Sequence, residues 1–98
     1  MTARRNLVYH SELALWVDTV AHRPENPRAH TNLGIALAEA GRLPEAVSQF
    51  EGSLALDPGN APTHLNLAHT LVALGRREEA IRLQEELRKY AGPKSQVM

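Results

Sequence analysis

The sequence predicts an all-α fold built from a repeated pair of helices, and three observations support this prediction. The chain of 98 residues matches itself when it is shifted by 34 residues, because residues 27–60 and 61–94 share nine identities without a gap. Within each period, apolar residues recur three and four positions apart, as they do on one face of an α-helix. Each period also has a central glycine, Gly41 or Gly75, at which a helix can end. We therefore expect five helices in a single domain that spans residues 1–98.

The first expected helix covers residues 11–23 and precedes the two full periods. Ser11 can cap its N-terminus. Its apolar stripe consists of Leu13, Trp16, Val17 and Val20. Pro24 follows this helix and stands 34 residues before Pro58. The helix is therefore in phase with the second helix of each repeat, and it counts as half a repeat.

The first full repeat, residues 27–60, is expected to hold two helices. Asn26 is a good N-cap, and Pro27 suits the first helical position because its missing N–H has no partner there anyway. The stripe of the first helix is Leu33, Ala36, Leu37 and Ala40, and that of the second is Leu43, Ala46, Val47, Phe50 and Leu54. Gly41 separates the two helices. The second helix should end at Asp57, because Pro58 cannot continue it.

The second repeat, residues 61–92, is expected to follow the same plan. Asn60 caps its first helix, which extends to Leu74 with Leu67, Leu71 and Leu74 on its stripe. The last helix should run from Arg77 to Tyr90, with Ala80, Ile81, Leu87 and Tyr90 pointing inward. Gly92 and Pro93 are expected to end it, which leaves residues 93–98 as a frayed tail.

Composition excludes several classes of function. The 11 basic and 11 acidic residues give a net charge of zero and a pI of about 7.0, whereas a nucleic-acid-binding domain is usually basic. The chain has no cysteine, so disulfides and thiolate metal sites are excluded. No window reaches the roughly 18 apolar residues of a membrane span. We expect a soluble chain with no nucleic-acid partner and no direct membrane insertion.

No arrangement of residues indicates a catalytic, metal or cofactor site. The serines lack the glycine-framed turn of a hydrolase nucleophile, and no glycine run could cradle a phosphate. His64 and His69 are five residues apart, which does not place them on one helical face. His30 and His64 occupy equivalent positions on neighbouring helix pairs, too far apart for one zinc ion. We expect no enzyme, no metal and no cofactor. The charged residues of the last helix are interpreted as a solvated face.

The repeated residues resemble the tetratricopeptide repeat (TPR), whose 34-residue pattern contains an aromatic residue, Leu-Gly, Tyr, Ala-x-x-x-Phe and a closing Pro. In the first repeat, Leu33-Gly34, Ala46-x-x-x-Phe50 and Pro58 match this pattern. The second repeat keeps Leu67-Ala68 and Ala80 but has Gln84 and Gly92 in place of Phe and Pro. The first aromatic position is taken by His30 and by His64. The resemblance covers roughly Ser11 to Tyr90.

The resemblance implies an α-α superhelix, a TPR solenoid of about two and a half repeats. It also implies a non-catalytic module whose concave groove binds a peptide or a partner protein. The groove positions would be Thr31, Asn32, Ile35, Ala38, Glu39, Leu65, Asn66, His69, Val72 and Ala73. Asn32 and Asn66 would hydrogen-bond a peptide backbone, although they could equally bond neighbouring helices or water.

The chemistry of the groove favours an apolar or neutral ligand segment. TPR grooves that clamp a carboxylate have lysine and arginine near these asparagines, whereas this chain has Ile35, His69 and Ala73 there. The helix over 61–74 contains no charged residue at all. Another subunit could instead cover this helix.

The alternative function is structural self-association, as a dimer or a helix-swapped assembly. Two and a half repeats are fewer than a solenoid needs to be stable alone, and Val17, Val20 and Leu83 lie near the ends of the stack. The segment from Arg5 to Val20 also resembles the start of TPR tails that follow multi-spanning membrane proteins of the glycosyltransferase type. The chain could then be the soluble tail of a larger membrane protein, on either side of the membrane. The sequence leaves the compartment, the partner and the oligomeric state open.

Overall fold

Five α-helices follow one another along the chain, which confirms the predicted all-α fold. The computed structural model describes the backbone of residues 2–97 and the side chains of residues 12–89. The helices are α1 (Thr2–His22), α2 (Pro27–Glu39), α3 (Leu43–Leu56), α4 (Ala61–Ala73) and α5 (Arg77–Val97). No strand occurs between residues 2 and 97.

The helix starts at α2 and α4 are fixed by asparagine caps, as predicted. The side-chain oxygen of Asn26 accepts a hydrogen bond from the backbone N–H of Arg28 at 2.9 Å. The side-chain oxygen of Asn60 accepts one from the N–H of Thr63 at 3.2 Å. Both bonds satisfy an N–H group that has no partner within the helix. The repeat therefore places the same cap at the same point of each period.

The turns that end α2 and α4 also repeat. Gly41 and Gly75 adopt φ angles of 82° and 81°, a region that residues with a Cβ avoid. After each glycine, the N–H of Arg42 or Arg76 reaches back to a leucine carbonyl at 2.8 Å. This bond is typical of a helix that ends in a left-handed residue. Glycine is required at both turns for this reason.

Both terminal helices extend beyond their predicted bounds. α1 begins at Thr2, not at Ser11, because no proline or glycine interrupts the residues between them. α5 continues through Pro93 to Val97, beyond the predicted end at Tyr90 and into the segment expected to be a frayed tail. A proline removes its own N–H bond and crowds the carbonyl four residues before it, which can kink a helix without ending it. The predicted inward position of Tyr90 lies outside the described side chains.

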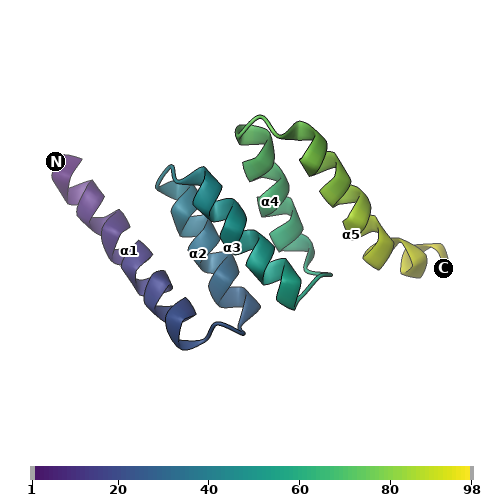
Figure 1. Cartoon of the computed structure of the whole chain (residues 1–98), viewed down its shortest axis with the longest axis horizontal. Coiled ribbons are helices and arrows are strands. Elements are labelled where there is room, and N and C mark those ends of the chain that lie inside the picture. The colour runs from purple at the N-terminus through teal and green to yellow at the C-terminus, as the bar shows by residue number, and fades with distance from the viewer. Residues whose placement is uncertain (1, 98) are drawn as a thin grey trace.

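The helices pack in sequence into an elongated stack, with α1 and α5 at opposite ends (Figure 1). The molecule measures 53 × 31 × 20 Å. α2 and α4 approach each other directly, whereas within the described residues α1 does not pack on α3, nor α3 on α5. Because the first helices of the repeats are closer together than the second helices, α2 and α4 lie on the inner side of the bend.

The core runs along the middle of the stack and is densest between α2 and α3. Phe50 is 1% exposed and Ala46 is fully buried. The ring of Phe50 lies against Gly34 of α2, where an added Cβ would come within 2.6 Å of a ring carbon. Glycine at this position therefore lets α2 and α3 pack closely.

The predicted inward position of Ile81 on α5 is wrong, because this side chain is 51% exposed. Val17, on the apolar stripe of α1, is 50% exposed. Each belongs to a helix at one end of the stack, which has a neighbouring helix on one side only, so part of its apolar stripe remains uncovered. Gln84, the residue of α5 equivalent to Phe50, is exposed. α5 therefore lacks the aromatic anchor that holds α3 to α2.

Candidate peptide-binding groove

The ten residues predicted to line a groove lie on α2 and α4, and none of them is fully buried. The exposed ones are concentrated on α4. Half-buried side chains are Thr31, Asn32, Ile35, Ala38 and Asn66, and exposed side chains are Glu39, Leu65, His69, Val72 and Ala73. α2 and α4 are neighbours on the inner side of the bend. We refer to these ten residues as the inner face.

The exposed part of α4 is apolar. Leu65 is 54% exposed and Val72 is 49% exposed. Together with His69 they stand at positions i, i+4 and i+7, which share one side of a helix. The 13 residues of α4 include no Lys, Arg, Asp or Glu. An uncharged strip of this kind can contact apolar groups without having to desolvate an ion.

Asn32 and Asn66 are equivalent residues of the two repeats, and both amides are half-buried. Among the side-chain hydrogen bonds of residues 12–89, none involves either amide. The backbone carbonyl of Asn66 accepts a bond from the hydroxyl of Thr70 at 2.8 Å, but its amide group stays available. Each amide can both donate and accept a hydrogen bond.

Thr31 is engaged inside the stack. Its Oγ1 lies 2.7 Å from Oγ of Ser53 on α3 and 2.8 Å from Oγ1 of Thr63 on α4. Ser53 and Thr63 are fully buried, and Oγ of Ser53 donates to the carbonyl oxygen of Pro27 at 2.9 Å. The only hydroxyl hydrogen of Ser53 is donated to Pro27. The hydroxyl of Thr31 must therefore donate to Ser53, and the hydroxyl of Thr63 must donate to Thr31. The three hydroxyls thus form a one-way chain that joins α2, α3 and α4.

His30 and His64 also serve the stack. Nε2 of His30 donates to the carbonyl oxygen of Pro24 at 2.8 Å, and Nε2 of His64 donates to that of Pro58 at 2.6 Å. Nδ1 of His30 lies 2.9 Å from the side-chain amide of Gln49, which can donate to it. The two histidines therefore tie the first turn of α2 and α4 to the preceding loop, at the position where the TPR pattern has an aromatic residue.

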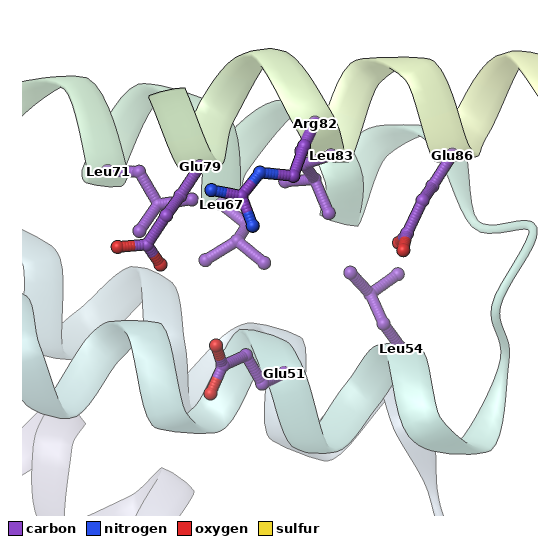
Figure 2. Close-up of a pocket in the computed structure, with 8 residues that line it drawn as sticks. All are labelled: Glu51, Leu54, Leu67, Leu71, Glu79, Arg82, Leu83 and Glu86. Atoms are coloured by element: carbon purple, nitrogen blue, oxygen red, sulfur yellow. The ribbon is translucent and has the colours of Figure 1, made fainter. Parts of the chain in front are cut away.

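A cavity on the opposite side of the stack contains residues that the sequence did not single out as a site. It has a volume of about 340 Å³ and lies between α3 and α5, with residues of α4 at its base. Figure 2 shows the side chains of α5 pointing toward those of α3 across it. Its lining residues are Glu51, Leu54, Leu67, Leu71, Glu79, Arg82, Leu83 and Glu86. We refer to this cavity as the outer groove.

One sequence signal pointed toward the outer groove. The last helix has Gln84 in place of an aromatic residue. The loss of that anchor suggests looser packing of the last helix, but periodicity alone gives no distance between two second helices. The glutamates of α5 were interpreted as a solvated face, and the structure places Glu79 and Glu86 at the edge of the outer groove.

Two repeat-equivalent ion pairs begin α3 and α5. Arg42 binds Glu45 with two hydrogen bonds of 2.6 Å, and Arg76 binds Glu79 with bonds of 2.7 and 2.6 Å. The bond from its arginine lowers the pKa of each glutamate below the usual value. The bond to Glu79, and to a smaller extent the charge of Glu51, raise the pKa of Arg76. Glu51 is therefore within electrostatic reach of this pair.

The chain resembles proteins of known structure over most of its length. A structure of MamA from AMB-1 has 27% identity and a TM-score of 0.76, and the match covers 87% of this chain and 50% of that one. MamA from MSR-1 has 26% identity and a TM-score of 0.79, with 92% and 52% covered. The chain thus spans about half the length of these MamA structures.

The TPR2B domain of yeast Sti1, solved as a complex with pHsp70, shares the fold. It has 19% identity and a TM-score of 0.78, and the match covers 87% of this chain and 68% of that one. No curated protein sequence matches the chain. Within the described residues, no helix has both the length and the apolar character needed to cross a membrane. The model of the tetratricopeptide repeat family matches residues 37–97, and the chain therefore belongs to that family.

Proposed function

We propose that the chain is a non-catalytic module that binds an apolar or neutral segment of a partner protein along the inner face. The observation that carries the proposal is the uncharged exposed strip of α4, in which Leu65 and Val72 are each about half exposed. The Sti1 domain of the same fold was solved in complex with pHsp70, which supports protein binding as a function of this fold.

The free amides supply the polar part of the recognition. Asn32 and Asn66 occupy equivalent positions on the neighbouring helices α2 and α4, and neither amide bonds another side chain of the described region. A bound peptide presents both N–H and C=O groups, which an amide can satisfy together. Apolar side chains of the partner would then lie on Leu65 and Val72.

A selection from a displayed peptide library provides ligands for a direct test. We expect the selected peptides to be rich in apolar residues and to bind without a free C-terminal carboxylate, because the inner face contains no lysine or arginine. The double variant Asn32→Ala/Asn66→Ala should weaken binding roughly 10-fold to 100-fold, the loss expected for two hydrogen bonds.

Gln84→Ala is the matched control, since it truncates an exposed amide on α5. It should leave affinity unchanged, and circular dichroism should show equal helix content in all variants. Peptides whose affinity survives the double asparagine change would refute the inner face as the binding site.

A further inference from the structure

The outer groove is apolar at its base. Leu67 and Leu71 form this base and are each 3% exposed, whereas Leu54 and Leu83 beside them are half-buried and keep part of their apolar surface uncovered. The groove exists because α5 does not pack on α3 within the described residues. Its volume of about 340 Å³ admits a few side chains of another helix.

The rim of this groove is acidic. Three glutamates and one arginine line it, which gives a net charge of −2. Glu79 is already bound by Arg76. Glu51 and Glu86 are exposed and have no ion-pair partner among the described side chains. The groove therefore suits an occupant that carries positive charge beside apolar groups.

The repeat pattern does not require glutamate at positions 51 and 86. Thirty-four residues before Glu51 and Glu86, the chain has Val17 and Gly52. The corresponding junction of α1 and α3 therefore lacks both rim carboxylates. The acidic rim belongs to the junction of α3 and α5 alone, although both junctions serve the same fold.

The start of α1 has the complementary composition. α1 has 21 residues and α2 has 13, so its first turns extend beyond the helix on which it packs. The sequence there contains Arg4 and Arg5 next to Leu7 and Val8. The first turn of α1 contains no acidic residue.

The two arginines are poorly placed for an isolated helix. The N-terminal end of a helix carries a partial positive charge, which favours nearby carboxylates and disfavours nearby cations. Carboxylates supplied by another molecule would therefore stabilise the start of α1 twice, by pairing with the arginines and by opposing the helix dipole.

We propose that the outer groove binds the N-terminal turns of α1 from a second copy of this chain. Leu7 and Val8 would contact the half-buried Leu54 and Leu83, and Arg4 and Arg5 would face Glu51 and Glu86. Because α1 and α5 lie at opposite ends of the stack (Figure 1), a molecule cannot fill its own groove. Copies must pair reciprocally or form a chain.

Analytical ultracentrifugation of the intact chain tests the proposal through charge reversal. The wild-type chain should show a mass above 10.8 kDa that rises with concentration and falls as salt screens the contact. The variants Glu51→Arg/Glu86→Arg and Arg4→Glu/Arg5→Glu should each be monomeric. An equimolar mixture of the two variants should associate again, since each then offers the charge that the other lacks.

Glu78→Arg/Glu85→Arg is the matched control, because it reverses two exposed glutamates of α5 that do not line the outer groove. It should associate like the wild type. A wild-type chain that stays monomeric at every concentration would overturn the proposal, and so would association that survives either groove or arginine reversal. Failure of the mixture to associate would equally contradict the pairing of these two surfaces.

Discussion

Nε2 of His64 donates a hydrogen bond to the carbonyl oxygen of Pro58 at 2.6 Å, and the same bond joins His30 to Pro24 one period earlier. The second nitrogen distinguishes the two sites. Nδ1 of His30 has a partner in Gln49, whereas Nδ1 of His64 is buried without one in the described region. The residue equivalent to Gln49 is Leu83, which has no polar group. The orphan nitrogen is therefore a consequence of one residue change between the repeats.

Leu83→Gln should supply the missing partner. Because Nε2 of His64 carries the hydrogen, Nδ1 is an acceptor, and the new amide can donate to it. In a double-mutant cycle with His64→Phe, residues 83 and 64 should show a favourable coupling of about 0.5–1.5 kcal/mol, as expected for one hydrogen bond. Urea unfolding of the four variants measures this coupling. Leu83→Met has a similar shape without a donor, and equal coupling for Met and Gln would contradict the explanation.

The chain of hydroxyls from Thr63 through Thr31 to Ser53 has a fixed direction, so its members should differ in importance. Ser53→Ala removes two bonds, one to Pro27 and one from Thr31, whereas Thr63→Val removes only one. We expect losses of unfolding free energy of about 2 and about 1 kcal/mol respectively.

Thr70→Val is the control for these changes. Thr70 is also buried, but its hydroxyl donates within α4, to the carbonyl of Asn66, so its removal breaks no contact between helices. Thermal or chemical unfolding followed by circular dichroism ranks the three variants. A cost for Thr63→Val that exceeds that for Ser53→Ala would show that the hydroxyls bond in another direction.

Because of the arginine–glutamate pairs at the starts of α3 and α5, we expect the stability of the fold to depend on pH in the acidic range. The lowered pKa of Glu45 and of Glu79 means that folding favours their ionised forms. Their contribution is present above the ordinary glutamate value of 4.5 and is lost as the pH falls through the lower folded value.

In the variant Glu45→Gln/Glu79→Gln, the free energy of unfolding should therefore fall less steeply as the pH drops below the ordinary glutamate pKa of 4.5. Both pairs are exposed to solvent, so the effect should be small and should shrink in high salt. Thermal midpoints measured from neutral to acidic pH, at low and high salt, test this. Glu12→Gln/Glu85→Gln serves as the control with the same change in charge. An unchanged acid profile in the first variant would indicate that the pairs add nothing to folding.

The sequence predicted most of the helical framework because the signals are local. Asn26 and Asn60 cap helices through bonds within three residues, and Gly41 and Gly75 act through their own backbone angles. The 34-residue period also predicted that a single helix, equivalent to the second helix of a repeat, precedes the two full helix pairs. The family model then confirmed the repeat.

The features that the sequence did not predict depend on neighbours distant in the chain. The outward position of Ile81 arises because α5 has a helix on one side only. The hydroxyl chain joins Thr31 to Thr63, which are 32 residues apart, and no local sequence pattern predicts this bond. The outer groove depends on the distance between α3 and α5. The presence of Gln84 at the position equivalent to Phe50 indicates looser packing but does not give this distance. The ligand role of the inner face remains a prediction that binding experiments must test.

Gly34 and Phe50 provide the sharpest test of helix packing. A methyl group at Gly34 would come within 2.6 Å of the Phe50 ring, closer than atoms tolerate, and the ring is almost fully buried and cannot move aside. Gly34→Ala should therefore destabilise the fold by about 1–3 kcal/mol, even though alanine favours a helix interior by about 0.5–1 kcal/mol. Chemical unfolding measures the difference.

The second repeat indicates the compensating change, since the residues equivalent to Gly34 and Phe50 there are Ala68 and Gln84. Phe50→Leu removes the ring atoms that the methyl group would strike. In that background Gly34→Ala should cost much less than in the wild type, or become stabilising through its helix propensity. An equal cost in both backgrounds would mean that the methyl group meets something other than the ring. The close approach of α2 and α3 would then need another explanation.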